Sequence, residues 1–268
     1  MRVDDFILEV KNLSVRYRVH GERKESDHGW IKAVDDVSIQ MRKGETFGLV
    51  GESGSGKSTV ARALVGLAPV HQGEIVFKGK TLQNLGMQTL PEKKRIQMIF
   101  QDPFHTLNPR HTVGMILEEP LKLHFKEWKK EQRRERISEL LTQVGLDSSA
   151  MQRYPHQFSG GQRQRIGIAR AISVEPQVII CDEVVSALDV SVQAQIINLL
   201  QDLQEQFGFT YLFIAHDLAV IEHISDQVAV MNAGKIVETG TSDEIYENPQ
   251  CEYTKKLFDS VPKLESLG

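Results

Sequence analysis

Three short motifs in this sequence carry residue types that handle phosphate groups: GESGSGKS at 51–58, SGGQ at 159–162 and VIICDE at 178–183. Glycines let the backbone bend until several N–H groups converge on one anion, and a lysine adds a positive charge. Serine and aspartate oxygens are ligands of the kind that magnesium prefers. Together the motifs predict an ATPase, and the second motif predicts that it pairs with another ATPase subunit.

The first motif fits the Walker A pattern G-x-x-x-x-G-K-[ST]. An apolar strand predicted over residues 46–50 leads into it and a helix predicted over residues 59–66 leads out, an order that a chance glycine-rich turn does not require. Lys57 would meet the β- and γ-phosphates, and the Ser58 hydroxyl would bind magnesium. The residues expected to bind nucleotide here are Gly51, Glu52, Ser53, Gly54, Ser55, Gly56, Lys57, Ser58 and Thr59.

The third motif is an apolar strand predicted over residues 178–181 that ends in Asp182 and Glu183, as in a Walker B motif. Asp182 would hold magnesium through its water shell, and Glu183 would orient or deprotonate the attacking water. A pair of acids after a strand is also a common helix cap. The Walker A motif in the same chain favours the catalytic interpretation.

Two further predicted strands end in polar residues, His216 after residues 211–215 and Gln101 after residues 95–100. Ligands bind at the carboxyl ends of parallel strands. His216 would contact the γ-phosphate and fix the water together with Glu183, and the Gln101 amide would reach the magnesium shell. An interior histidine and an ordinary loop glutamine are the competing interpretations.

The second motif predicts a helix N-terminus that binds an anion. Ser159 suits the N-cap of a helix predicted from Gln162 to about residue 173, and Gly160 and Gly161 permit close backbone approach. Because the Walker A loop already serves the nucleotide of this chain, the anion would come from a facing subunit. An ordinary capped helix would explain the serine but not the two glycines.

Composition is consistent with an intracellular enzyme: the 268 residues are 40% hydrophobic and 25% charged, with a net charge of −4 and a pI of 6.2. The apolar runs are the length of strands, and the N-terminus does not look like a signal peptide. Of the two cysteines, Cys181 falls within a predicted core strand, so no structural disulfide is expected. The acidic balance argues against nucleic-acid binding.

Elsewhere, strand and helix alternate as in a parallel α/β core, after a β-rich layer predicted over residues 6–10 and 33–41. A polar loop is expected over residues 21–29. A strand over residues 235–238 and two short helices are expected in the C-terminal tail.

Two helices are predicted from apolar stripes with helical spacing. Ile137, Leu140, Leu141 and Val144 form the first, with Gly145 as its C-cap and the basic run 129–136 as its solvated start. The second stripe is predicted to be core and consists of Ile196, Ile197, Leu200, Leu203 and Phe207.

The order of Walker A, Gln101, SGGQ, Walker B, SALD at 186–189 and His216 resembles the nucleotide-binding domain of ABC transporters over nearly the whole chain. Longer stretches resemble the F-type ATP-binding subunit of bacterial oligopeptide and dipeptide importers. These stretches are IQMIFQDPFHTLNPR at 96–110, RYPHQFSGGQRQRIGIARA at 153–171, VSALDVSVQAQIINLL at 185–200 and FIAHDLAVIEHISDQVAVM at 213–231.

The resemblance implies an α/β fold of the P-loop NTPase class, with a RecA-like core, an antiparallel β subdomain and a helical subdomain that contains the signature. A single nucleotide-binding domain would fill residues 1–268. Its core and β subdomain would occupy about 1–101 and 176–240, its helical subdomain about 102–175, and a helical tail about 241–268.

The resemblance also implies roles for individual residues. Tyr17 would stack on adenine, and Asp189 would lie in the D-loop that meets the opposing Walker A loop. ATP and Mg²⁺ are the expected cofactors, with Ser58, Gln101 and Asp182 as the residues around the metal. Two departures stand out: Val184 replaces the usual proline after the Walker B glutamate, which should loosen that turn, and the sequence given ends without a cysteine-rich tail, so no iron–sulfur cluster is expected.

The expected partners are a second ABC ATPase subunit, either a D-type relative or another copy, and two membrane permease subunits at the cytoplasmic face of the cell membrane. An extracytoplasmic solute-binding protein would act indirectly. The segment 102–110 follows Gln101, and its apolar Phe104 and Leu107 are predicted to be exposed for contact with the permease. Packing of Phe104 between subdomains is the alternative.

Other interpretations remain open at the level of sequence. Nickel, metal–chelator complexes or other solutes could replace peptides as cargo, because the ATPase does not touch what is carried. A soluble ABC ATPase would be expected to have two motif sets or a long coiled-coil insertion, and neither occurs. A regulatory subunit without turnover would be expected to lack Glu183 or His216, and both are present.

Overall fold

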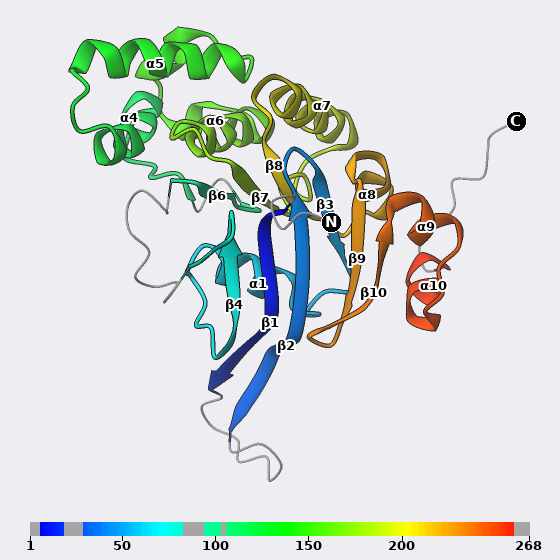
Figure 1. The fold of residues 1–268 in the computed structure, drawn as a ribbon. Coiled ribbons are helices and arrows are strands. Elements are labelled where there is room, and N and C mark those ends of the chain that lie inside the picture. The colour runs from blue at the N-terminus through cyan, green and yellow to red at the C-terminus, as the bar shows by residue number, and fades with distance from the viewer. Residues whose placement is uncertain (1–5, 19–28, 83–93, 103–105, 260–268) are drawn as a thin grey trace, which may run out of the picture. The chain divides into compact units, whose positions relative to one another are not determined.

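The computed structural model describes residues 6–18, 29–82, 94–102 and 106–259. The chain divides into two compact units, one formed by Met1–Met87 and Leu212–Gly268 and the other by Gln88–Tyr211. The first unit appears in blue, cyan, orange and red in Figure 1, and the second mainly in green and yellow. The chain returns to the first unit within β8 (Thr210–Ile214).

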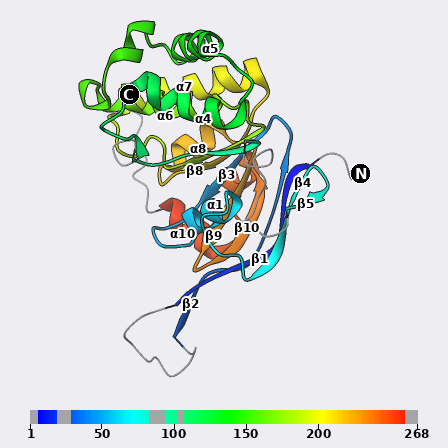
Figure 2. The same ribbon diagram turned by 90° about the vertical axis from the view of Figure 1, so that its left-hand side faces the viewer.

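The first unit contains an antiparallel sheet with strand order β2-β1-β4-β5. The first two strands form a long ribbon (Figure 2) and extend well beyond the predicted ranges 6–10 and 33–41. The four strands are β1 (Phe6–Arg18), β2 (Trp30–Arg42), β4 (Gln72–Phe77) and β5 (Lys80–Thr81). The loop predicted over residues 21–29 lies almost entirely outside the described residues.

The same unit holds the strand that leads into the Walker A loop. β3 (Thr46–Val50) matches the prediction and is buried at every residue. It runs parallel to β9 (Gln227–Asn232), which pairs antiparallel with β10 (Lys235–Thr241). Among the described residues of this unit, the helices are α1 (Lys57–Leu64), α8 (Leu218–Ile224), α9 (Ser242–Glu247) and α10 (Glu252–Asp259). The prediction of two short helices in the tail is therefore confirmed.

The second unit pairs β6 (Ile96–Ile99) with β7 (Val178–Asp182) in parallel. The helices in the described part of this unit are α4 (Val113–His124), α5 (Lys130–Gln143), the short η2 (Ser148–Gln152) and η3 (Pro155–Gln157), α6 (Gly160–Ile172) and α7 (Val190–Phe207). The helices predicted within residues 102–175 therefore lie in this unit, together with β6, β7 and α7. None of the helices among the described residues is long and apolar enough to cross a membrane.

The two predicted apolar stripes behave differently. All four residues of the α5 stripe are buried, so the predicted stripe is confirmed. The C-cap is Val144, one residue before the predicted Gly145, which follows it in the left-handed conformation with φ 72. On α7 the prediction is wrong for Phe207, which is 41% exposed. It is the last residue of the helix, where Gly208 ends the helix in the left-handed conformation and the Phe207 ring stacks on Phe209.

Two predicted helix starts also needed correction. α1 begins at Lys57 instead of residue 59, and α6 begins at Gly160 instead of Gln162. In both cases glycine or polar motif residues form part of the first helical turn. The residues that the prediction left out are Lys57, Ser58, Gly160 and Gly161. None of them has an apolar side chain, so an amphipathic pattern cannot detect them.

Close packing of β3 against α8 generates a prediction about stability. A Cβ atom on Gly48 would lie 2.6 Å from both Ile221 Cγ2 and Ser225 Oγ. Gly48→Val should therefore lower the free energy of unfolding by about 1–3 kcal/mol, measured by urea denaturation. The control is Gly167→Ala on α6, where a Cβ would meet no atom within 4 Å, so stability should hold or rise. Equal stability of Gly48→Val and the wild type would contradict the packing argument.

Candidate functional site

The Walker A loop, residues 51–56, packs closely against two backbone segments of its own unit. A Cβ on Gly51 would lie 2.1 Å from the Met231 carbonyl oxygen, and one on Gly56 would lie 2.3 Å from the Ala33 carbonyl oxygen. Both glycines also have positive φ, 147° and 111°. No other residue fits at these two positions without moving β9 or β2.

Lys57 lies inside the loop and is 4% exposed. Its Nζ donates to the carbonyl oxygens of Gly51 at 2.7 Å and Glu52 at 2.8 Å, and approaches Ser55 Oγ at 3.4 Å. The loop therefore wraps around one positive charge at the start of α1. Gly54 has φ 80, and a Cβ there would meet no atom within 4 Å. A curved backbone with a central ammonium group fits a polyphosphate.

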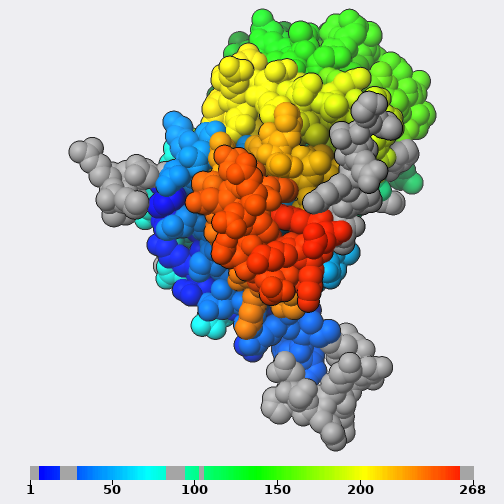
Figure 3. Space-filling view, turned by 90° about the vertical axis from the view of Figure 1, so that its right-hand side faces the viewer, coloured from blue at the N-terminus to red at the C-terminus, as the bar shows by residue number. Residues whose placement is uncertain are grey.

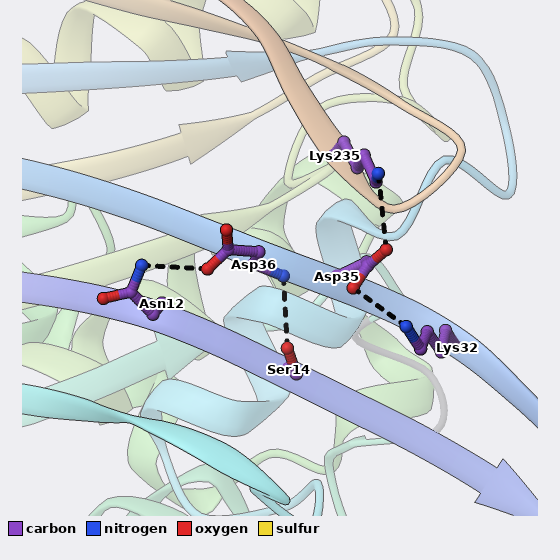
Figure 4. A network of polar contacts seen from close by, with 6 residues as sticks. All are labelled: Asn12, Ser14, Lys32, Asp35, Asp36 and Lys235. Carbon is purple, nitrogen blue, oxygen red and sulfur yellow. Dashed lines mark hydrogen bonds and ion pairs between the residues drawn. The ribbon is translucent and has the colours of Figure 1, made fainter.

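The turn between β9 and β10 fastens the loop to β2. The Gly234 N–H donates to the Ser55 carbonyl at 2.9 Å, and the Asp35 N–H donates to the Gly234 carbonyl at 2.8 Å. The Asp35 carboxylate also contacts Lys32 at 3.3 Å and Lys235 at 3.5 Å (Figure 4). The hydrogen bond from Lys32 lowers the pKa of Asp35, so the carboxylate stays charged at neutral pH.

Figure 4 also shows how β1 holds β2 beside this turn. Asn12 and Asp36 both have positive φ, 52° and 59°. The Asn12 side chain donates to the Asp36 carboxylate at 2.9 Å, and the Asp36 N–H donates to Ser14 Oγ at 3.1 Å. These bonds fix the irregular pairing of the two strands next to the stretch that carries Ala33 and Asp35.

Two other predicted site residues lie in the first unit. His216 follows β8 and is exposed, so the competing interpretation of an interior histidine is wrong. Asp217 caps α8 directly after it by accepting from the Ala219 N–H at 2.9 Å. Tyr17 lies on β1 opposite Ile31 with 39% of its surface exposed, which leaves its ring open to contact. Its role in stacking on adenine stays a prediction.

In the second unit, the parallel strands β6 and β7 bring three predicted residues to one edge. Ile99 pairs with Cys181, so Gln101, Asp182 and Glu183 all lie at the same end of this strand pair. Asp182 and Glu183 are 5% and 8% exposed, whereas Gln101 is exposed. Carboxyl ends of parallel strands are the usual position of ligand sites.

Glu183 has a left-handed backbone, with φ 52, a conformation that costs energy in any residue other than glycine. The turn that follows holds it there. The Ser186 N–H and Oγ both donate to the Glu183 carbonyl, at 3.1 and 3.0 Å, and Gln101 Nε2 lies 3.4 Å from Ser186 Oγ. Val184 is buried in this turn, with 1% exposed. Ser186 links Gln101 to Glu183, a role that its place in the SALD motif did not reveal.

Ser159 is the N-cap of α6, as predicted. Its Oγ accepts from the Gln162 N–H at 3.3 Å, and the Gln162 side chain accepts from the Ser159 N–H at 3.1 Å. A Cβ on Gly161 would lie 2.5 Å from Val192 Cγ1. Packing against α7 therefore requires Gly161 independently of any anion, so this glycine is weaker support for an anion site than the sequence suggested.

Asp189 is the N-cap of α7 and accepts from Ser191 Oγ at 2.7 Å and from the Val192 N–H at 3.0 Å. The bond from Ser191 is the main cause of its lowered pKa. Val190, directly after it, is 81% exposed.

Of the two apolar residues predicted to contact the permease, Phe104 and Leu107, the structure describes only Leu107. Leu107 is 2% exposed, so the prediction that it is exposed for a partner is wrong. Its neighbour Thr106 is fixed to α6, because Arg170 donates to the Thr106 carbonyl at 3.0 Å. Phe104 lies outside the described residues, and its contact with a permease stays a prediction.

The candidate residues divide between the units: Tyr17, the Walker A residues and His216 belong to the first, and Gln101, Ser159–Gln162, Asp182, Glu183 and Asp189 to the second. Among the described residues, no group of three or more His, Cys, Asp or Glu side chains is arranged so that it could hold a metal ion. Magnesium in phosphate sites usually binds one or two protein carboxylates, water and phosphate oxygens. Of the two buried carboxylates here, Asp182 would bind the magnesium shell and Glu183 the attacking water, which fits that pattern.

The sequence profile described as ABC transporter matches residues 34–186 of this chain, more than half of its length. The chain belongs to the ABC transporter family. Membership in this family means that the chain is a nucleotide-binding ATPase with a P-loop NTPase fold, as the motifs predicted.

Curated members of the family include two similar proteins. The oligopeptide transport ATP-binding protein AppF of Bacillus subtilis is 50% identical over 264 residues, which covers 98% of this chain and 80% of that protein. The oligopeptide transport ATP-binding protein OppF of Escherichia coli is 50% identical, covering 96% of this chain and 78% of that protein.

Solved structures of the family agree with the fold. One is the cbiO1 protein of Clostridium perfringens, part of the ABC transporter complex cbiONQ, with a TM-score of 0.77 and 26% sequence identity. The superposition covers 91% of this chain and 92% of the cbiO1 chain. The ATP-binding cassette MJ0796, a dimer in a post-hydrolysis state with ADP and Pi, has a TM-score of 0.73 at 27% identity, covering 88% and 98%. The predicted α/β fold class is therefore confirmed.

The hydroxyl of Ser186 generates a prediction. Ser186→Ala removes the bonds to the Glu183 carbonyl and to Gln101 but keeps the backbone bond of the turn. Since each hydrogen bond contributes about 0.5–1.5 kcal/mol, kcat for ATP hydrolysis should fall about fivefold or more with KM little changed. Thr142→Ala, which removes a hydroxyl bonded to the Ser138 carbonyl on α5, is the control and should keep wild-type turnover. A wild-type kcat for Ser186→Ala would exclude Ser186 from positioning Glu183.

Proposed function

We propose that this chain is the ATP-hydrolysing subunit that energises a bacterial importer of oligopeptides or dipeptides. The observation that carries this proposal is the 50% identity with the oligopeptide transport ATP-binding protein AppF over 98% of this chain. The likeness is not confined to the common nucleotide motifs, since it extends through the helical segment and the C-terminal strands. The cargo is assigned by this likeness alone.

In the proposed reaction, the Walker A loop binds the β- and γ-phosphates, with Lys57 as the cation and the backbone N–H groups as donors. Ser58, Gln101 and Asp182 would hold Mg²⁺ and its water shell. When bound, magnesium neutralises phosphate charge as the bond to the leaving group breaks. Glu183 accepts a proton from the attacking water, and His216 steadies the γ-phosphate and that water.

The backbone at Glu183 supports its role as the base. A left-handed conformation in a buried acidic residue is energetically unfavourable and persists only where surrounding structure enforces it. The Ser186 bonds supply that enforcement. Fixing the base in advance lowers the entropy cost of reaching the transition state.

A second ATPase subunit would complete the site through Ser159, Gly160, Gly161 and Gln162. At the N-terminus of α6, Ser159 and Gln162 are exposed and Gly161 is buried. These two exposed side chains and the exposed Val190 support this part of the proposal, as does the dimeric state of MJ0796. In the cell we expect a D-type relative as the partner, with a homodimer as the alternative. Asp189 would contact the Walker A loop of that partner.

The same proposal places the chain at the cytoplasmic face of the cell membrane, held there by two permease subunits. An extracytoplasmic solute-binding protein would deliver the peptide. The segment after Gln101 remains the proposed contact with the permease. Its described part is fixed, because Arg170 donates to the Thr106 carbonyl and Leu107 is buried.

The first prediction from this proposal concerns Glu183→Gln, which keeps the shape of the side chain but removes the base. ATP binding should remain near wild type, and turnover should fall by ~10²-fold or more. In a strain that lacks the gene, wild type should restore growth on tripeptides as the only source of a required amino acid, and Glu183→Gln should not. Growth on the free amino acid is the control for general fitness.

Lys57→Ala provides the contrast, since loss of the loop cation should abolish nucleotide binding itself. Hydrolysis at the wild-type rate by Glu183→Gln would remove Glu183 as the base. Normal tripeptide use by the deletion strain, with ATPase activity intact in the purified chain, would contradict the peptide cargo but not the ATPase assignment.

The second prediction concerns assembly. ATP should convert Glu183→Gln into a dimer, measured by light scattering, because the uncleaved nucleotide would bridge two subunits. Adding Val190→Glu should weaken this association while the melting temperature stays unchanged, since that side chain is 81% exposed and a carboxylate there would face the partner. If the chain stays monomeric at saturating ATP with each candidate partner supplied, the shared site is wrong.

A further inference from the structure

The C-terminal helices α9 and α10 make contacts that the proposed function does not use. They belong to the first unit, together with the Walker A loop and His216. Figure 3 shows them in orange and red on the surface of the molecule. Each helix carries one tyrosine whose hydroxyl forms a hydrogen bond with the backbone of a site segment. Tyr246 of α9 bonds to the backbone near His216, and Tyr253 of α10 bonds to the backbone of the Walker A loop.

α9 is bonded to both ends of α8. Tyr246 donates from its hydroxyl to the Leu218 carbonyl at 2.7 Å, at the first residue of α8. At the other end of α8, Ser242 Oγ donates to the Glu222 carbonyl at 3.3 Å. Leu218 follows His216 by two residues. The position of α8, and with it the start of the segment that carries His216, is therefore tied to α9.

α10 is fixed at its N-terminal end by an acidic residue of β10. The Glu238 carboxylate accepts from the Gln250 N–H at 2.6 Å and from the Cys251 N–H at 3.1 Å. A carboxylate at this end of a helix is favourable for the helix dipole. The rings of Tyr246 and Phe258 stack with centroids 4.8 Å apart and an angle of 9°. This stacking joins α10 to α9.

From this fixed helix, Tyr253 reaches the Walker A loop. The Glu52 N–H donates to the Tyr253 hydroxyl oxygen at 3.3 Å. Glu52 follows Gly51, whose carbonyl oxygen accepts from Lys57. Burial raises the pKa of Tyr253, so its hydroxyl stays neutral at physiological pH. A neutral hydroxyl can accept this N–H while the Glu52 side chain remains exposed.

We propose that Tyr253 is a positioning residue for nucleotide binding, which holds the first turn of the Walker A loop from α10, and that Tyr246 does the same for the His216 segment from α9. The two helices α9 and α10 thus hold the Walker A loop and the His216 segment in the positions that the proposed reaction needs. We call this arrangement the α9–α10 brace. The inference rests on the proposed function in one respect, that the Walker A loop binds ATP. Neither tyrosine contacts the substrate in this proposal.

The two hydroxyls should affect different constants. Tyr253→Phe should raise the KM for ATP, and the Kd of a fluorescent ATP analogue, by about two- to tenfold, the effect of one hydrogen bond, with kcat within twofold. Tyr246→Phe should lower kcat by a similar factor with KM little changed, because its contact leads to His216. Tyr154→Phe, at a half-exposed tyrosine of the second unit, is the control and should change neither constant.

A second variant tests the same brace from its other end. Glu238→Ala releases the N-terminus of α10 and should raise the KM for ATP as Tyr253→Phe does. Because both changes act through one contact, the double variant should raise KM no further than the larger single effect. If the increases in KM of the two single variants added up in the double variant, Glu238 and Tyr253 would act independently. That result would overturn the proposal that Tyr253 acts from a fixed α10.

The outcomes separate this inference from the proposed function. A wild-type chain that fails to bind the ATP analogue would contradict the proposed function itself. A wild-type chain that binds the analogue while Tyr253→Phe keeps the same KM and Kd would overturn only the inference. A lowered melting temperature with unchanged KM would show that Tyr253 stabilises the fold without positioning the loop, and would also overturn it.

Discussion

Contact between backbones at the Walker A loop is the constraint on which the first unit depends. The carbonyl oxygens of Met231 and Ala33 lie where side chains at Gly51 and Gly56 would otherwise stand. The loop can curve around Lys57 only because those two positions carry no Cβ. β2 and the β9–β10 turn must in turn hold their carbonyls in place, which explains the bonds from Gly234 and Asp35.

In the second unit the main constraint is different, because the acidic residue Glu183 is held in an unfavourable backbone conformation. Glu183 directly follows the fully buried strand β7 and has a left-handed backbone conformation. The two bonds from Ser186 to one carbonyl oxygen make that turn stiff. Proline is usual at the next position in the family, and here the buried Val184 packs in its place. Hydrogen bonding therefore stabilises a turn that the sequence alone suggested would be loose.

Much of the fold could be predicted because the signals were local. The strand 46–50, the cap at Ser159 and the stripe on α5 depend on residues close in sequence, and all three are confirmed. Contacts between distant segments gave no such signal. Gly161 is required by Val192, and Leu107 is buried although its sequence neighbours are polar. Tyr253 meets a loop some 200 residues earlier, which periodicity cannot detect.

The two cysteines differ in a way that makes the chain convenient to study. Cys181 lies in the interior strand β7, where burial raises the pKa of its thiol and keeps it from reacting. Cys251 is partly exposed and directly precedes α10, two residues before Tyr253. A maleimide dye would thus label the folded protein at Cys251 alone, directly before α10. The unmodified sequence already contains a single-site probe for the segment that touches the Walker A loop.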